Sequence, residues 1–572
     1  MADMHDPAPM GFFGRYRTPL LICFLVLAVR LPVIGAVGLG DSEAYYWTWS
    51  KHLDLSYFDH PPAVAYVIRA GTAIFGDTAF GARILPTLLA TATLFVVYLA
   101  GEALAGAAAG LLSMGVLISM PLFIVGGVAA APDSPQVLFV AFAVLFYLKA
   151  RKPPATCHQP TGSRLQASGF RLPPHACVVL AGLSLGLAFL SKYSALMLIP
   201  GLLAALALPS NRHWFRRPSF YAGVLLCALC SIPVVAWNAA HDWGTLTYHF
   251  VSRQGNAGFS LTNLGKLVGG QLAYFSPFVV VGFAWAVKKA VASRRSPVAS
   301  LPDEAMTKSG GQYAADSGQS SVVGRELLFE LVLIGLPAVL FFYLVILVTP
   351  NAEPHWPLCG YIPLAVVLGA TLAGGDLRLA THDSRPAPSQ AACSLQPTAY
   401  SLRPLFPRLT VASIVFSLVV VAVAHVHILT PAIARLLPAS HNPKHDLTNE
   451  LYGWDVVGAR IGERMAKFHG NRPFLLGYHY TFCSQLMFAT GGRIETRCLN
   501  KRKDQFDFFP GAAGPFTGRD ALYVRDNRYN KAPGDLYLFD RCDPGEKVQI
   551  DRAGRKVREF EMFLCHGSKG IK

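Results

Sequence analysis

Charged residues are scarce in this chain of 572 residues: Asp, Glu, Lys and Arg together make up 15%, whereas 52% of the residues are hydrophobic. The mean hydropathy is +0.38. A soluble enzyme of this length needs a larger share of polar surface. The composition therefore excludes an ordinary soluble enzyme and favours a polytopic membrane protein.

Acidic residues are fewer than basic ones, 34 against 50, which gives a net charge of +16. A basic excess is also typical of nucleic-acid-binding proteins, but here Lys and Arg cluster in short loops between apolar runs. In membrane proteins such clusters mark the cytoplasmic side. We therefore expect membrane lipids, and no nucleic acid, as partners.

Roughly eleven apolar runs approach the length of about 20 residues that crosses a bilayer. Their approximate centres are residues 28, 90, 115, 141, 183, 200, 229, 277, 337, 365 and 419. The run around residue 28 follows a basic N-terminal region, as in a signal peptide. It is followed by "IGAVGLGDSEA", which contains no A-x-A cleavage site, so we expect a retained anchor.

Four basic segments separate these runs: "KARKPP" from Lys149, "RHWFRR" from Arg212, "KKAVASRR" from Lys288, and the loop from Arg378 to Arg408. Placing all four in the cytoplasm, together with Arg15 and Arg17, gives one consistent zigzag. The N-terminus is then cytoplasmic and the C-terminus lies outside.

The composition changes after the last run. Residues 431–572 are polar, with the alternating segments "DALYVRDN" and "DLYLFD" and the helical pattern "LYGWDVVGARIGERMAKF". They predict a small extracytoplasmic α/β domain that follows a helical transmembrane domain over residues 1–430. Four cysteines fit an oxidising compartment, where disulfides persist, and three pairings are possible: Cys483, Cys498, Cys542 and Cys565.

The first outer loop, residues 39–78, begins with "GLGDSEAYYWTWSKHLDLSYFDHPP" from residue 38. Asp41 and Glu43 stand where the first span ends, at the depth of the phosphate headgroups. Tyr45, Trp49 and Leu53 have helical spacing, so one face is expected to lie flat in the membrane interface. An aromatic anchor with solvated acids is the simpler interpretation of this loop.

Further ionisable and polar residues converge on the same side of the predicted topology. They are Asp59 and His60 in "YFDHPP", Asp133 in "APDSP", Lys192 in "LSKYS", Arg253 and Gln254 in "TYHFVSRQGN", and His355 in "NAEPHWP". Charges near membrane depth are costly and mark function by default. Carboxylates and cations around one outer cavity predict chemistry on a phosphate-bearing substrate.

Single residues also have simpler interpretations. Lys192 can extend along an apolar surface to reach water. Arg30, inside the first span, is expected to have a structural partner or to line the cavity. His479 in the external domain is read as an ordinary surface or core histidine.

Several segments resemble the bacterial glycosyltransferase family 39, which is related to the protein O-mannosyltransferases and to the lipid A aminoarabinose transferase. They are "DSEAYYWTWSKHLDLSYFDHPP", "GLAFLSKYSALMLIPGL", "YHFVSRQ" and "PHWPLCGYIPL". The segments "CSQLMFATGG" and "NKRKDQFDFF" resemble the tail of the same group more loosely. The resemblance implies a type C glycosyltransferase in the bacterial inner membrane, with its C-terminal domain in the periplasm.

The implied activity moves a sugar from a polyprenyl-phosphate donor to an envelope acceptor at the periplasmic face. Lipid A, the lipopolysaccharide core, another glycolipid or a protein are all possible acceptors. A hexose, a uronic acid or an aminopentose are all possible sugars. A protein O-mannosyltransferase-like enzyme is an alternative within the class. A transporter of a lipid-linked or anionic substrate is an alternative of another class, although no inverted repeat is visible in the sequence.

The resemblance also implies residue roles. The base corresponds to Asp41 or Glu43, which Ser42 separates here although the two acids are adjacent in the family. Asp133 matches a second acid of the active site. Asp59 stands where a carboxylate holds a divalent metal, so whether a metal is bound stays open. His60 stands where a phosphate-binding lysine is found, and the remaining contacts to donor phosphate or sugar are Lys192, Arg253, Gln254 and His355.

The chemistry requires these residue types independently of the family. An acceptor hydroxyl must lose a proton while a phosphodiester leaves, so one carboxylate acts as general base. Cations or a metal ion then stabilise the departing phosphate.

Overall fold

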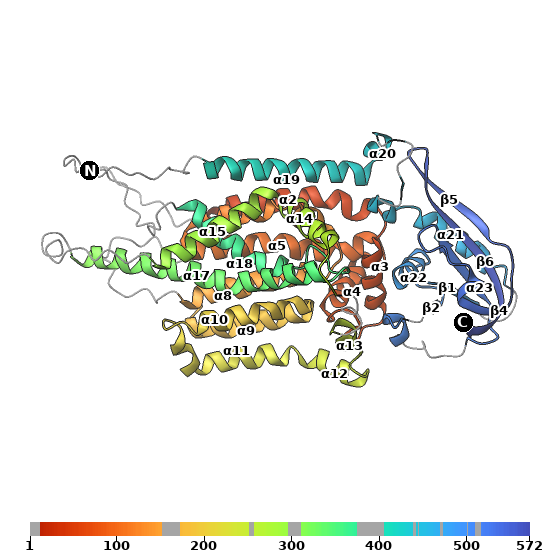
Figure 1. Cartoon of the computed structure of the whole chain (residues 1–572), viewed down its shortest axis with the longest axis horizontal. Helices are drawn as coiled ribbons and strands as arrows, with labels where there is room; N and C mark the ends of the chain where they lie inside the picture. Colours follow the sequence, from red (N-terminus) through yellow and green to blue (C-terminus); the bar gives the residue numbers. More distant parts are fainter. Residues whose placement is uncertain are drawn as a thin grey trace, which may run out of the picture.

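The computed structural model describes residues 12–151, 172–250, 257–295, 311–374, 405–436 and most of 438–572. Within the last range, residues 439–441, 444, 445, 469–472, 500, 501 and 510–515 are not described. Figure 1 shows long helices lying side by side, with a β-sheet domain against one end of the bundle.

The membrane part is helical throughout its described length. Its long apolar segments are α2 (Arg17–Ala36), α5 (Ala79–Ala105), α8 (Asp133–Arg151), α9 (Pro174–Ser191), the successive helices α11 (Pro218–Leu229) and α12 (Ile232–Ala240), the bent pair α14 (Leu261–Phe275) and α15 (Pro277–Arg295), α17 (Gly311–Val348) and α19 (Leu405–Leu429). Shorter elements between them are α3 (Asp41–Lys51), α4 (Ala63–Phe75), α6 (Ala107–Ile118), α7 (Pro121–Val125), η1 (Gly126–Val128), η3 (Tyr193–Leu198), α10 (Ile199–Leu206), α13 (Gly244–Phe250) and α18 (Leu358–Ala373).

The described residues contain seven helices that are long and apolar enough to span a membrane, or up to nine if each of two bent pairs is one span. The predicted number of about eleven is therefore not confirmed. The difference lies in the runs centred near 200 and 365, which form apolar helices of fewer than 18 residues, Tyr193–Leu206 and Leu358–Ala373. Hydropathy marks such segments as apolar but does not fix where their helices begin and end.

Helix α5 is central to the bundle and contacts α2, α4, α6, α8 and α18. Arg30 of α2 is fully buried beside it. Its Nη1 donates to Thr91 Oγ1 of α5 at 2.8 Å, and its Nη2 and Nε donate to the carbonyls of Phe123 and Ile124. The first expectation for Arg30, that it has structural partners inside the protein, is therefore the one observed.

The basic ends of several helices meet at the end of the bundle away from the sheet. Arg151 at the end of α8 pairs with Glu330 of α17 at 2.9 Å. Asn211, in the turn before "RHWFRR", donates to the same carboxylate at 2.8 Å. Arg294 of α15 stacks on Phe329 of α17. Three of the four predicted cytoplasmic segments thus share one side, and the fourth, 378–408, lies almost wholly outside the described residues.

The C-terminal domain contains a mixed sheet in the order β2-β1-β3-β6-β4, with β5 paired to β6. The strands are β1 (Phe474–Gly477), β2 (Thr496–Cys498), β3 (Ala521–Asp526), β4 (Tyr537–Cys542), β5 (Glu546–Arg552) and β6 (Arg555–Ile571). The predicted helical pattern forms α21 (Trp454–Met465), and α22 (Tyr480–Ala489) packs against α3 of the membrane part. The predicted small α/β domain is confirmed.

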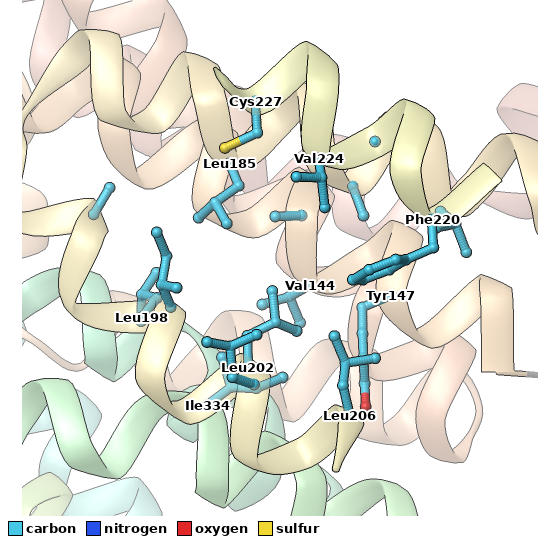
Figure 2. Close-up of a pocket in the computed structure, with 18 of the residues that line it drawn as sticks. Val144, Tyr147, Leu185, Leu198, Leu202, Leu206, Phe220, Val224, Cys227 and Ile334 are labelled. Atoms are coloured by element: carbon cyan, nitrogen blue, oxygen red, sulfur yellow. The ribbon is translucent and has the colours of Figure 1, made fainter. Parts of the chain in front are cut away.

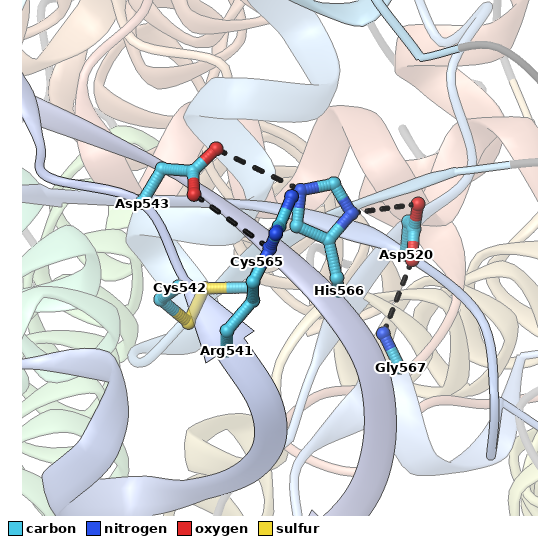
Figure 3. Close-up of a disulfide and its surroundings, with 7 residues drawn as sticks. All are labelled: Asp520, Arg541, Cys542, Asp543, Cys565, His566 and Gly567. Carbon is cyan, nitrogen blue, oxygen red and sulfur yellow. Dashed lines mark hydrogen bonds and ion pairs between the residues drawn. A yellow bond between two sulfur atoms is a disulfide. The ribbon is translucent and has the colours of Figure 1, made fainter.

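One of the possible disulfide pairings is present, between Cys542 of β4 and Cys565 of β6, which face each other in the antiparallel ladder. Figure 3 shows this bridge beside His566, whose ring lies between Asp520 and Asp543. Cys483 and Cys498 are buried thiols, and Cys498 Sγ lies 3.6 Å from Asp504 Oδ2.

Candidate functional site

Helix α3 begins directly after the first span. Gly40 is its N-cap. The negative charges of Asp41 and Glu43 lie in the first turn, where they interact favourably with the positive end of the helix dipole. Tyr45 and Trp49 are 3% and 0% exposed and pack in one cluster with Cys483 and Cys498 of the C-terminal domain. For Tyr45 and Trp49 the predicted position in the membrane interface is therefore wrong, because they are buried in a cluster shared with the C-terminal domain. Leu53, the third residue of the predicted face, lies beyond the end of α3 and is 49% exposed. An aromatic helix face has the same pattern against protein as against lipid.

Glu43 is held on every side. Its Oε1 accepts from Arg83 Nε at 2.7 Å and from the amide of Ala130 at 2.8 Å. Its Oε2 accepts from Arg83 Nη2 at 2.6 Å and from the amide of Gly40 at 2.8 Å. Burial alone would raise its pKa, but the Arg83 guanidinium and the two amides together lower the pKa of Glu43 below its ordinary value. A carboxylate with four donors is a poor proton acceptor and fixes the loop instead.

Arg83 of α5 was not identified from the sequence. It also donates to the carbonyls of Ile34, Val37 and Gly38, so it joins α5 to the end of α2 and to α3. Its place near the start of a long apolar run is the signal that could have indicated it, since an arginine there needs a buried partner.

Asp41 contacts the C-terminal domain. Its Oδ1 accepts from Gln485 Nε2 of α22 at 3.1 Å, and its Oδ2 pairs with Arg528 Nη1 at 3.0 Å. Arg528 also pairs with Asp526 and Glu450, so its charge is shared among three carboxylates. Unlike Glu43, Asp41 receives no paired guanidinium fork from Arg528, which contacts it through one nitrogen.

A second group of residues lies at the start of α8 and the end of α9. Lys192 is buried, and its Nζ lies 2.8 and 2.9 Å from the two oxygens of Asp133. His355 and His60 are close enough for their charges to act on Asp133. Four predicted site residues from four separate segments are thus brought together. Lys192 does not extend along an apolar surface to water but is paired within the protein.

Asp59 joins this cluster to α3. Its Oδ2 accepts from the hydroxyl of Tyr45 at 2.7 Å, and its backbone carbonyl lies 3.0 Å from Nε2 of His249. Tyr45 is one helical turn after Asp41, so both residues lie on the same face of α3. Burial, and secondly the Asp59 charge, raise the pKa of Tyr45 well above its ordinary value, which keeps it a hydrogen-bond donor.

Asp59 is the position at which a metal-binding carboxylate is expected. Among the described residues, no group of three or more His, Cys, Asp and Glu side chains is placed to hold a metal ion. The described residues around Asp59 therefore do not form a metal centre by themselves. The predicted metal stays a prediction.

Two residues of the C-terminal domain were missed or undervalued by the sequence reasoning. Arg502, from "NKRKDQFDFF", lies close enough to Asp59 and Tyr45 for their charges to act on it. His479 stacks on Tyr529 and lies within electrostatic range of Asp41 and Arg502. Burial, and secondly the Arg502 charge, lower the pKa of His479 to about 4, so its imidazole is neutral near pH 7. Arg253 and Gln254 lie outside the described residues.

An apolar cavity of about 490 Å³ lies between α8, α9, α10 and α11. Figure 2 shows its lining, which includes Val144, Leu185, Leu198 and Val224. Ala195 and Leu198 belong to η3, which begins immediately after Lys192. One border of the apolar cavity is therefore η3, the element that follows Lys192, and the cavity extends from there along α8 as far as Arg151.

The fold and this group of acids, cations and tyrosines define a class: a polytopic membrane protein with a polar site between its helical bundle and its C-terminal domain. A family model described as dolichyl-phosphate-mannose-protein mannosyltransferase matches residues 59–157 and 174–237. This match begins at Asp59 and includes Asp133 and Lys192.

Lipid A galacturonosyltransferase RgtD of Rhizobium johnstonii is 28% identical over 286 residues, which are 49% of this chain and 55% of the relative. The chain thus matches about half the length of this curated relative. ArnT from Cupriavidus metallidurans bound to undecaprenyl phosphate is 14% identical, with a TM-score of 0.57 over 96% of this chain and 98% of that chain. The same protein in the apo state is 15% identical, with a TM-score of 0.57 over 97% and 98%. The predicted resemblance to glycosyltransferase family 39 is confirmed, and the fold is the type C glycosyltransferase fold.

Proposed function

We propose that this protein is an integral membrane glycosyltransferase that moves a sugar from a polyprenyl-phosphate donor to lipid A or a related envelope glycolipid. The observation that carries the proposal is the grouping of Asp133, Lys192, His60 and His355 beside an apolar cavity. This arrangement suits a donor with a charged phosphate and a long apolar chain. The resemblance to lipid A galacturonosyltransferase RgtD supports a glycolipid acceptor and a hexuronic acid as the sugar.

The reaction needs one proton acceptor. We assign this role to Asp41, because the oxygens of Glu43 already accept four hydrogen bonds. Asp41 takes the proton of the acceptor hydroxyl as that oxygen bonds to the anomeric carbon. The bond between the anomeric carbon and the phosphate oxygen breaks, and the electron pair of that bond stays on the phosphate oxygen. Attack opposite to the leaving phosphate gives inversion at the anomeric carbon.

The departing phosphate gains negative charge, which Lys192 and His60 are placed to stabilise. Asp133 holds Lys192 through both of its oxygens and so fixes the ammonium group. The prenyl chain occupies the apolar cavity that η3 borders, because the side chains that line this cavity are mostly apolar. We further propose that the protein lies in the bacterial inner membrane with residues 431–572 in the periplasm.

The test uses the purified protein in lipid nanodiscs with three polyprenyl-phosphate donors, carrying a hexuronic acid, a neutral hexose or an aminopentose. Lipid A and a Ser/Thr-rich peptide are offered as acceptors, and products are identified by mass spectrometry. We expect a glycosylated lipid A and no glycopeptide. A glycopeptide alone would support the protein O-mannosyltransferase-like alternative, to which the description of the matching family points. No transfer from any of the three donors, with the folded protein verified, would contradict the proposal.

A further inference from the structure

The groups around the candidate site follow a definite order. The apolar cavity is bordered by η3, which follows Lys192, and Lys192 pairs with Asp133. Asp59 accepts from the hydroxyl of Tyr45, the ring of Tyr45 lies 4.5 Å from that of Tyr480, and Tyr480 contacts Arg502. A lipid-linked sugar has a parallel order of chain, phosphate and sugar ring. If the phosphate lies at Lys192, the far side of the sugar ring points toward Arg502.

Two tyrosine side chains lie against the guanidinium of the exposed residue Arg502. Its carbon lies 4.6 Å from the ring centre of Tyr248 and 5.5 Å from that of Tyr480. Its Nη2 donates to the hydroxyl of Tyr248 at 2.6 Å. Aromatic rings contact the faces of a guanidinium, whereas a carboxylate binds along its edge, often through two parallel hydrogen bonds. Stacking therefore prepares this arginine for a planar anion and reduces the entropy lost on binding.

The distribution of charge around the site also favours a donor with an acidic sugar. A hexuronosyl donor carries one negative charge on its phosphodiester and a second on its sugar, at the end of the ring away from the phosphate. At the phosphate end, Lys192 is already paired with Asp133, so this end adds no net positive charge for a second anion. At the other end, Asp59 would repel a sugar carboxylate. Arg502 of the C-terminal domain brings a cation there through Tyr480, which contacts Tyr45, the donor to Asp59.

Resting on the function proposed above, we infer that Arg502, held by Tyr248 and Tyr480, binds the carboxylate of a hexuronosyl donor and selects it over neutral hexoses. The C-terminal domain thereby takes part in choosing the sugar. A phosphate would also bind an arginine edge, so the experiment must separate the two anions.

The experiment compares two donors that differ only at C6, polyprenyl-phosphate hexuronic acid and polyprenyl-phosphate hexose. Dissociation constants are measured for the whole protein in nanodiscs, so the result does not depend on turnover of the neutral donor. Arg502→Gln should raise the dissociation constant of the hexuronosyl donor about tenfold to a hundredfold, the usual range for one hydrogen-bonded charge. The constant of the hexosyl donor should stay within about threefold of the wild-type value.

Arg502→Lys keeps the charge without the planar fork and should recover part of the lost affinity. Lys503→Gln, at the neighbouring exposed cation, is the matched control and should alter neither constant. Unchanged hexose binding in Arg502→Gln also shows that the variant is folded.

Equal losses for both donors would place Arg502 at the phosphate and overturn this inference, while leaving the proposed transferase intact. A wild-type protein that binds the hexose as well as the hexuronic acid would also overturn it, since no selection would exist. A wild-type protein that binds neither donor would instead contradict the proposed function itself.

Discussion

Replacing Glu43 by Gln separates structure from catalysis in the first outer loop. The amide is the same size as the carboxylate but carries no charge, and only its oxygen accepts hydrogen bonds. Two of the four donors around Glu43 would then face an NH₂ group, and the Arg83 guanidinium, whose side chain is 4% exposed, would lose its counter-charge. Removing one partner of such a buried pair costs about 3–5 kcal/mol.

Thermal unfolding of the purified protein in detergent measures this effect, with the folded fraction determined by size-exclusion chromatography after heating. We expect Glu43→Gln to unfold several degrees below the wild type. Glu463→Gln is the matched control, because Glu463 pairs with Arg460 at 2.7 Å where both side chains are exposed, and such pairs contribute about 0–1 kcal/mol. Adding Arg83→Gln to Glu43→Gln should cost less than the sum of the two single changes.

The opposite pattern would refute the reasoning. If Glu43→Gln unfolds at the wild-type temperature while sugar transfer falls by several powers of ten, Glu43 is the base and Asp41 holds the loop in place. If Glu43→Gln is much less stable and its activity falls only as far as the folded fraction falls, Glu43 has a positioning role.

Three further outcomes follow from the site. Asp41→Asn should lower kcat by about 10²–10⁴-fold, and it should lower the unfolding temperature less than Glu43→Gln does, because Arg528 keeps Asp526 and Glu450 as partners; a variant with wild-type kcat contradicts the assignment of the base. If a divalent metal binds at Asp59, a chelator should inhibit the wild type and leave Asp59→Asn unaffected; a wild type indifferent to chelator excludes the metal. For His479, the folded pKa of about 4 lies below the ordinary 6.5. As pH falls from 6.5 toward 4, the unfolded chain takes up a proton that the folded protein does not, so stability is lost over this window. His479→Gln should therefore lose less stability than the wild type between pH 7 and 4.5, by at most about 3 kcal/mol; parallel pH curves for the two proteins contradict the shift.

The sequence was most informative where local patterns determine local structure. Apolar runs indicated the spans, and alternation indicated β3 and β4. It also placed Asp59, His60, Asp133, Lys192 and His355 on one side through the order of spans, and the structure brings them into one neighbourhood. Each of these residues adjoins an apolar segment, so its depth follows from chain topology alone.

Contacts between distant segments were not predictable in this way. The Glu43–Arg83 fork joins residues 40 positions apart, and the Asp41–Arg528 pair joins residues 487 positions apart. Nothing in the periodicity of α3 tells a membrane surface from the surface of α22, so its aromatic face was assigned to lipid. In the sequence Arg502 is one of several neighbouring basic residues, and only its contacts with Tyr248 and Tyr480 indicate a role.

The contacts of Gln505 have a consequence for the biogenesis of the protein. The backbone amide of Gln505 donates to the Tyr45 hydroxyl at 3.0 Å, and its side-chain oxygen accepts from the backbone amide of Phe58 at 2.7 Å. The ribosome synthesises this residue after every described span has been made. The segment 39–78 is therefore made and inserted before the partner that restrains Tyr45 and Phe58 exists. A chain that ends before Gln505 would lack both contacts, so the site would be completed only after the C-terminal domain has folded.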